Sequence, residues 1–208
     1  MQADSTAMSD LILQEHDLGL TWVHKEAMAR TCHALVDDGR VWLIDPTDED
    51  EALDRAAALG EPAGVLQLLD RHNRDCAAIA ARLGVGHHVV PDAVPGSPLT
   101  AIGVVRLPRW RETALWWPDA RVLVVAETVG TNAVYAVGPG PVGVHPFLRL
   151  LAPGALRPFE PEHLLVGHGT GVHGPAAAPA LQDALARSRR DIPRLAARLP
   201  ALARAARA

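Results

Sequence analysis

Short apolar runs, each bounded by turn or helix signals, recur through the first part of the chain and constrain its fold more than any other feature. Cys32–Val36 and Val41–Ile44 flank Asp37-Asp38-Gly39, a typical hairpin turn sequence. Further along, helical segments alternate with the apolar strands Val65–Leu69 and His87–Val90. The order hairpin, helix, strand, helix, strand predicts an α/β fold with helices layered on a sheet.

Capping residues mark the helix boundaries. Thr47 precedes four acidic residues, so we expect it to be the N-cap of a helix that ends at Gly60. Asp75 is expected to cap a second helix, Cys76–Leu83, which Gly84 ends.

The second half of the chain has strand signals at hairpin-like spacing, which indicates an antiparallel region. A short helix is expected at His145–Leu151. A helix and a helical tail follow from about Ala176, with breaks at Pro193 and Pro200. The expected strands are Ile102–Leu107, Ala114–Trp117, Val122–Val125, Ala133–Val137 and His163–Val166.

Length and composition suit one globular domain with a sizeable core, because the 208 residues are 49% hydrophobic and 21% charged. We expect a single domain over 1–208, with a flexible N-terminus at 1–10 and an arginine-rich helical tail at about 186–208. The net charge of −4 provides no basic field for nucleic acid.

Several features indicate the cellular compartment. No apolar run approaches the roughly 20 residues that span a bilayer, and residues 1–10 lack the pattern of a signal peptide. Cys32 and Cys76 do not suggest a secreted disulfide framework. We therefore expect a soluble cytoplasmic protein without a membrane or nucleic-acid partner. A small-molecule ligand and a homodimer formed through the apolar tail are the partners left open.

Five short motifs follow one another in fixed structural contexts. They are Leu43-Ile44-Asp45-Pro46 at the end of the hairpin, Arg71-His72-Asn73-Arg74-Asp75-Cys76 between a strand and a helix, Leu107-Pro108-Arg109-Trp110, Ala126-Glu127 after an apolar strand, and Gly167-His168-Gly169 after the last strand. Over roughly Thr31 to Gly174, this order resembles the metallo-β-lactamase-fold hydrolases. In that family the motifs are an Asp-Pro-Gly-like turn, His-x-His-x-Asp-His, Pro-Gly-His, Gly-Asp and Gly-His-Gly.

The resemblance implies an α/β fold, a four-layer αβ/βα sandwich in which two mixed β-sheets pack face to face with helices outside. It also implies a site built from loops at one edge of that sandwich. Members of the family use one or two zinc ions, which lower the pKa of a bound water and polarise the bond to be cut.

Carried over position by position, the resemblance implies that the first metal half-site is lost, because Arg71, Asn73 and Trp110 replace its histidines. Arginine is always cationic and would repel a metal ion. We expect His72 to be an outward loop residue, since shifting the alignment by one residue would break the match at Asp75. Pocket positions are thus assigned to Arg71, His72, Asn73 and Trp110.

The second half-site keeps chemically competent groups. Asp75 and His168 match the family, Cys76 replaces a histidine, and Glu127 replaces an aspartate, so this set could bind a single zinc ion. Each residue also has a structural interpretation. Asp75 could only cap a helix, Cys76 could be a small buried residue, and Glu127 could pair with Arg71 in a salt bridge.

Three functions compete. We favour a site converted to an arginine–carboxylate cluster, without a cofactor and without the usual zinc-hydrolase activity. The alternative is a divergent mono-zinc hydrolase of an ester, thioester or similar small substrate, with Asp75, Cys76, Glu127 and His168 as ligands and Asp75 also orienting the nucleophile. A third option is metal-free acid/base catalysis by Glu127 and His168, with Arg71 holding an anionic substrate. The candidate catalytic residues are therefore Asp75, Glu127 and His168.

Overall fold

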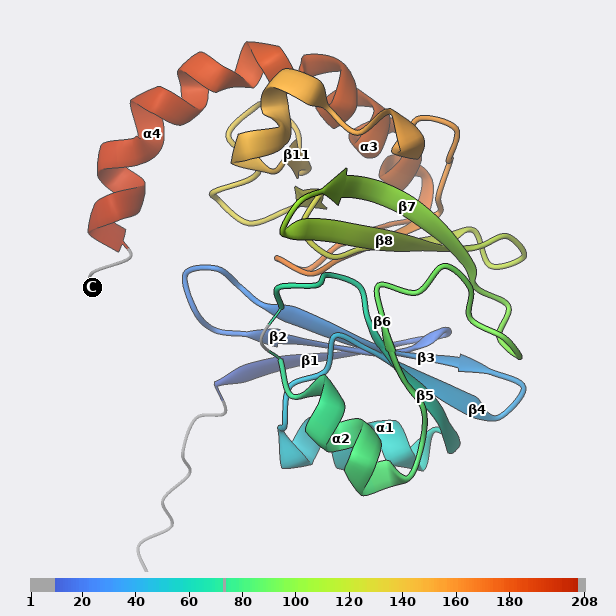
Figure 1. Ribbon diagram of the computed structural model, residues 1–208. Coiled ribbons are helices and arrows are strands. Elements are labelled where there is room, and N and C mark those ends of the chain that lie inside the picture. Colours follow the sequence, from blue (N-terminus) through green and yellow to red (C-terminus); the bar gives the residue numbers. More distant parts are fainter. Residues whose placement is uncertain (1–9, 73, 206–208) are drawn as a thin grey trace, which may run out of the picture.

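Two β-sheets lie face to face in the computed structural model, which describes residues 10–72 and 74–205 (Figure 1). The first sheet has the strand order β1-β2-β3-β4-β5-β6, antiparallel from β1 to β4 and parallel from β4 to β6. Its strands are β1 Leu11–His16, β2 Gly19–His24, β3 Thr31–Asp37, β4 Arg40–Ile44, β5 Glu61–Gln67 and β6 His87–Val89.

The second sheet has the order β13-β12-β9-β8-β7, in which only the central pair β9 and β12 is parallel among the described strands. Its strands are β7 Thr100–Leu107, β8 Trp110–Trp117, β9 Val122–Val125, β12 His163–Val166 and β13 Val172–His173. A separate two-stranded ribbon pairs β10 Val129–Gly130 with β11 Gly143–Val144.

Helices cover the outer faces of both sheets (Figure 1). The α1 and α2 helices lie under the first sheet, α3 lies over the second, and α4 curves away from the body. Their bounds are α1 Asp50–Ala58, α2 Cys76–Leu83, α3 Ala177–Arg187 and α4 Ile192–Ala205, and the short 3-10 helices are η1 Pro146–Leu151, η2 Gly154–Leu156, η3 Gly174–Ala176 and η4 Ser188–Asp191. The expected four-layer αβ/βα sandwich is confirmed.

Strand alternation divides the apolar side chains of the first sheet between two cores. Trp42 and Ile44 of β4 belong to the large core between the sheets, together with Leu115 and Leu123 of the second sheet. Leu43, between them on β4, faces a smaller core that also contains residues of α1 and α2. The two mixed sheets are therefore joined through one continuous apolar layer, with a second layer beneath the helices.

Two details of the first 140 residues differ from the sequence-based expectations. Ala133–Val137 is a turn and not a strand, because Asn132 accepts hydrogen bonds from the backbone N–H groups of Val134 and Tyr135. Thr47 does not cap α1. It is buried and accepts a hydrogen bond from the indole of Trp22.

The C-terminal segment also differs in part. Pro200 lies inside α4 and does not interrupt it. Arg187 is buried and pairs with the buried Asp191 at 2.9 Å, so the arginines of this segment are not all on a solvated face. Of the tail predicted at 186–208, residues 206–208 lie outside the described part of the chain, as do residues 1–9 of the expected flexible N-terminus.

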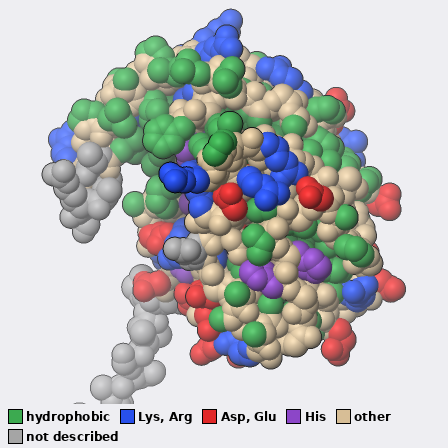
Figure 2. All heavy atoms as spheres, viewed as in Figure 1, with side chains coloured by type: hydrophobic (Ala, Val, Ile, Leu, Met, Phe, Trp, Pro, Cys, Tyr) green, Lys and Arg blue, Asp and Glu red, His purple; other side chains and the backbone are tan. Residues whose placement is uncertain are grey.

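The surface shows interspersed charges and an apolar region. Figure 2 shows hydrophobic side chains gathered over the upper part of the molecule, where η1 and α4 lie. Phe147, Leu150 and Leu151 of η1 are all largely exposed. Within the described residues, no helix has both the length and the apolar character needed to cross a membrane. The homodimer and the cytoplasmic location stay predictions.

Truncating the core between the sheets should be costly. Leu123 on the central strand β9 is fully buried, so Leu123→Ala should lower the free energy of unfolding by about 2–5 kcal/mol. Urea denaturation measures the effect. Leu107→Ala is the matched control, because Leu107 is 51% exposed and should lose far less. Equal losses would contradict this core assignment.

Candidate functional site

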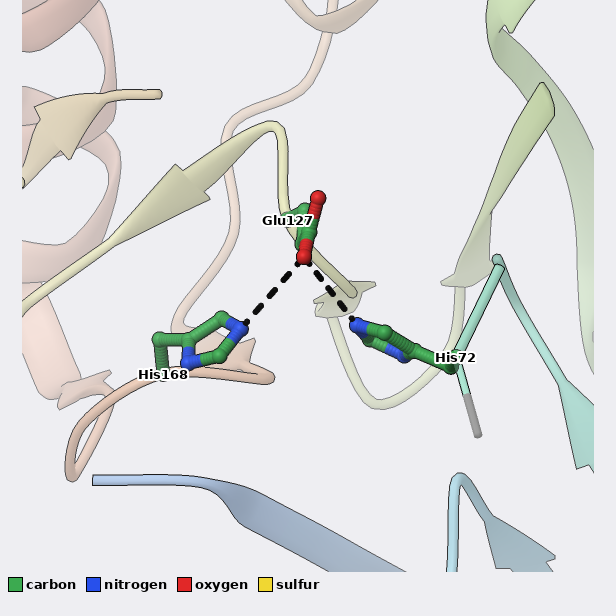
Figure 3. A group of neighbouring side chains, drawn as sticks. All are labelled: His72, Glu127 and His168. Atoms are coloured by element: carbon green, nitrogen blue, oxygen red, sulfur yellow. Dashed lines mark ion pairs between the residues drawn. The ribbon is translucent and has the colours of Figure 1, made fainter. Parts of the chain in front are cut away.

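The candidate site lies where loops leave the carboxyl ends of three strands (Figure 3). His72 follows β5, Glu127 follows β9 and His168 follows β12. Because β9 and β12 are parallel neighbours, with Val125 opposite Val166, the loops that carry Glu127 and His168 emerge side by side. Fold topology thus brings together residues that are far apart in the sequence.

The Glu127 carboxylate faces two imidazoles. Its Oε1 atom lies 3.5 Å from Nε2 of His72 and 3.8 Å from Nε2 of His168 (Figure 3). One ligand atom from each of these three residues lies within 4.8 Å of the other two. A carboxylate and two imidazoles are a donor set that suits zinc and similar divalent ions.

Each histidine is held from behind by an acceptor. Nδ1 of His168 donates to the carbonyl oxygen of Met28 at 3.0 Å, and Nδ1 of His72 lies 3.4 Å from Oδ2 of Asp45. Nε2 of both histidines is buried and has no hydrogen-bond partner among the described residues, and the same holds for Nδ1 of His72, whose contact with Asp45 is an ion pair. This is the arrangement by which outer carboxylates and carbonyls orient histidine ligands toward a metal.

Asp45 is a buried anchor for the loop after β5. It is 2% exposed, and its Oδ1 accepts the backbone N–H of Leu68 at 3.1 Å. Burial raises the pKa of Asp45, but the nearby His72 and Arg74 outweigh this effect and hold the pKa below its usual value. The carboxylate is therefore charged at neutral pH and fixes both the loop and the imidazole of His72.

The predicted ion pair between Arg71 and Glu127 is present. An Arg71 guanidinium nitrogen lies 2.8 Å from Oε2 of Glu127, and the guanidinium stacks over the ring of Trp110 at 4.1 Å. Arg71 remains 42% exposed. The salt bridge uses one carboxylate oxygen and leaves the other, Oε1, directed at the histidines.

Glu112 of β8 holds the backbone at Glu127 through hydrogen bonds. Its Oε1 accepts the backbone N–H groups of both Glu127 and Thr128 at 3.0 Å. Burial raises the pKa of Glu112 to about 7, even though these two hydrogen bonds lower it. Glu112 therefore fixes the start of the loop that presents Glu127.

The charges around Glu127 affect its ionisation and that of its neighbour His72. Burial raises the pKa of Glu127, but His168, His72 and Arg71 outweigh it and hold the pKa far below its usual value. Burial lowers the pKa of His72, yet Asp45 and Glu127 raise it above 6.5 overall. Glu127 is thus ionised throughout the physiological range.

The expectation that His72 points outward is wrong. Its side chain is only 9% exposed and lies between Asp45 and Glu127. The family-based alignment assigned this loop's inward positions to Arg71 and Asn73. Asn73 lies outside the described residues. His72 turns inward because the buried carboxylate of Asp45 attracts its imidazole.

Other residues singled out in the sequence lie near the site without facing Glu127. Asp75 is exposed at the start of α2 and makes no capping bond with its side chain, which accepts the backbone N–H of Asp48 at 2.9 Å. Cys76 is buried beside the carbonyl oxygen of Pro46, and burial raises the pKa of its thiol. Trp110 is 7% exposed and forms a floor beneath Arg71.

Sequence reasoning missed His145 and Tyr135. Nε2 of His145 lies 4.0 Å from Oε2 of Glu127, and the Tyr135 ring stacks on His168 with centroids 5.6 Å apart. Nδ1 of His145 accepts the backbone N–H of Phe147, which leaves Nε2 to donate toward the carboxylate. Both residues lie on irregular segments after β9, where no spacing pattern signals that they approach the site.

An open pocket of about 620 Å³ leads to His72, Glu127 and His168. Arg74 also lines it, but its guanidinium is engaged by backbone carbonyl oxygens, including those of Asp45 and Gly167. Most of the lining residues are charged or polar. They are Glu26, Ala27, Met28, Arg30, Arg71, His72, Arg74, Glu127 and His168. The site is therefore accessible to a small polar ligand.

Solved structures share this architecture. The chain aligns with VMB-1 at a TM-score of 0.57 and 10% identity, over 87% of this chain and 97% of VMB-1. It aligns with the DIM-1 metallo-β-lactamase at a TM-score of 0.50 and 11% identity, over 86% of this chain and 98% of DIM-1. No protein-family model matches the sequence, and no curated protein matches it. The chain has the metallo-β-lactamase fold.

Removing the buried anchor should destabilise the protein. Asp45→Ala leaves the N–H of Leu68 without its acceptor and the imidazole of His72 without its ion-pair partner, at about 1–3 kcal/mol for each buried group. Urea denaturation at pH 7 measures the loss. Asp48→Ala is the control, because Asp48 is 44% exposed in its pair with Arg82 and should cost less than about 1 kcal/mol. Similar losses in both variants would show that Asp45 does not hold the loop.

Proposed function

We propose that the chain binds one divalent metal ion through His72, Glu127 and His168. The ligand types, two imidazoles and a carboxylate, favour zinc. The observation that carries the proposal is the pair of buried Nε2 atoms that face one carboxylate oxygen and have no hydrogen-bond partner in the described part of the chain. Buried polar nitrogens are rarely left unpaired, so a ligand at this point would account for both. The donor atoms, the acceptors behind the imidazoles and the pocket all fit such an ion.

The site supports one ion and not two. Where the fold relatives' first motif would supply further histidines, this chain has Arg71, and Trp110 lies directly beneath its guanidinium. A fixed positive charge stacked on an indole opposes a second cation. We therefore propose that the chain lacks the usual two-metal reaction and keeps a single-metal version of the site.

The geometry favours a catalytic site over a structural one. Structural zinc sites have four protein ligands, whereas catalytic sites have three and an open position. Here three ligands face an open pocket. A bound zinc ion would supply Lewis acidity, which suits hydrolysis of an ester, thioester or similar small substrate.

The surrounding residues would then have distinct tasks. Asp45 and the Met28 carbonyl hold the imidazoles in orientation, and Glu112 holds the backbone of the Glu127 loop. Arg71 is half-exposed at the pocket, so its outer face is available to a carboxylate or phosphate of the substrate. His145 can donate a proton toward Oε2 of Glu127.

A second candidate is a site without any metal, closed by ion pairing. The contact of 2.8 Å between Arg71 and Glu127 favours it, because a guanidinium can replace the charge of a lost cation. In this case the site is an arginine–carboxylate cluster and the protein is not a hydrolase. Metal analysis separates the two candidates.

Substitution of His72 or His168 should lower the zinc content of the protein, whereas substitution of Cys76 should not. In protein purified without chelator, His72→Ala and His168→Ala should each contain about one zinc ion per chain less than the wild type, as measured by elemental analysis. Cys76→Ala is the matched control and should keep its metal. Zinc lost from Cys76→Ala would instead support ligation by Asp75 and Cys76. If His72→Ala and His168→Ala have the same zinc content as the wild type, even with excess zinc, the result would favour the metal-free arginine–carboxylate cluster.

Arg71 should limit metal affinity. Arg71→Met keeps an apolar stem over Trp110 and removes the like charge, so zinc affinity measured by calorimetry should rise by about tenfold. Arg111→Met is the control, since Arg111 is exposed and does not line the pocket. A weaker affinity in Arg71→Met would mean that the guanidinium supports metal binding instead of opposing it.

A further inference from the structure

Three histidines gather at a second position, away from the Glu127 loop. His163 begins β12, His173 ends β13, and His16 ends β1 of the other sheet. The rings of His163 and His173 have centroids 5.2 Å apart, and those of His16 and His173 are 5.9 Å apart. Because His168 follows the carboxyl end of β12, His163 marks the opposite end of that strand. The two clusters are therefore separate.

The sheet itself pairs two of these histidines. His163 and His173 are direct partners in the antiparallel register of β12 and β13, and their Nδ1 atoms share a hydrogen bond of 2.9 Å. Two nitrogens bound to one zinc ion at about 2.05 Å, with an angle of 90–109°, are separated by about 2.9–3.4 Å. The backbone thus places the pair at nearly the spacing that a single ion requires.

The His16 ring lies beside that of His173, and one of its ring nitrogens is already held. Its Nε2 lies 3.2 Å from the hydroxyl of Thr21, which is itself 2.9 Å from Nδ1 of His33. Nδ1 of His16 is buried and has no hydrogen-bond partner among the described residues. A hydrogen bond behind the ring, with the other nitrogen unpaired, again matches the way proteins orient a histidine ligand.

The three histidines line an open hollow of about 710 Å³, which Asp17 also lines. Burial lowers the pKa of His16 to about 4, with smaller contributions from His173 and His163, and burial also lowers the pKa of His173. Neutral imidazole is the form that binds metals. The hollow provides access for an ion, and the Asp17 carboxylate is a nearby oxygen donor.

We propose that His16, His163 and His173 form a second site, for a divalent transition-metal ion of the zinc or nickel class. Such an ion would draw the three rings closer together, because their ligand atoms do not all lie within 4.8 Å of one another. Such an ion would connect β1 of the first sheet to β12 and β13 of the second. Metal binding at this site would therefore stabilise the packing of one sheet against the other. The inference does not depend on the function proposed for the Glu127 site.

The test uses tag-free full-length protein in which His72→Ala and His168→Ala remove the first site. Calorimetric titration with Zn²⁺ should show about one remaining ion per chain, and Zn²⁺ should raise the melting temperature. Adding His173→Gln should abolish the rise in melting temperature. It should also weaken Zn²⁺ binding by more than roughly 10–100-fold, the loss typical of a residue that only supports a ligand. His163→Gln should behave alike.

His88→Gln is the matched control, a partly exposed histidine outside both clusters, and should leave binding unchanged. If the double variant does not fold, the wild type serves, and His173→Gln should lower its zinc stoichiometry by about one. Circular dichroism of the metal-free variants verifies folding. The proposal is overturned if the double variant binds no Zn²⁺ or if His173→Gln binds it as tightly. Loss of zinc only in His72→Ala would support the first site and reject the second.

Discussion

The buried charge of Asp45 determines how the candidate site is built. Its backbone lies at the end of β4 with a φ of 46°, and its carboxylate holds Leu68 on one oxygen and faces His72 with the other. An isolated buried carboxylate would be costly, so the imidazole and the N–H group that compensate it are fixed in place. The segment after β5 then continues onto β8, where Leu69 pairs with Glu112. One carboxylate thus links both sheets to the loop that carries His72.

Glu127 stands between two kinds of cation, a guanidinium on Oε2 and the two imidazoles on Oε1. An ion bound at Oε1 would share the carboxylate with Arg71, which both neutralises the site and weakens its hold on a cation. The balance between a metal site and a salt bridge is therefore set by one exposed arginine. A chain that differs at position 71 would have a different balance with the same fold.

Much of the fold could be predicted because local signals and tertiary packing agree. The strands β9 and β12 and the helix α2 occur at the expected bounds, since apolar runs and a terminal glycine define them. The prediction of a strand at Ala133–Val137 was wrong because the side chain of Asn132 forms a turn that overrides the apolar pattern. His72 could not be placed from the sequence, because its direction depends on Asp45, a residue on another strand. The proximity of Glu127 to His168, and the contact between Glu127 and Arg71, could be predicted because motif order indicates which strand ends meet.

The best-matched motif, Gly167-His168-Gly169, carries two separate kinds of information. A Cβ atom at Gly167 would lie 2.3 Å from the carbonyl oxygen of Ala126, and one at Gly169, where φ is 107°, would lie 2.0 Å from the Thr131 hydroxyl. The glycines are thus demanded by backbone packing whether or not any chemistry takes place. In evolutionary terms, backbone packing alone can preserve such glycines. Only the central histidine, together with the residues that face it, bears on the chemistry of the site.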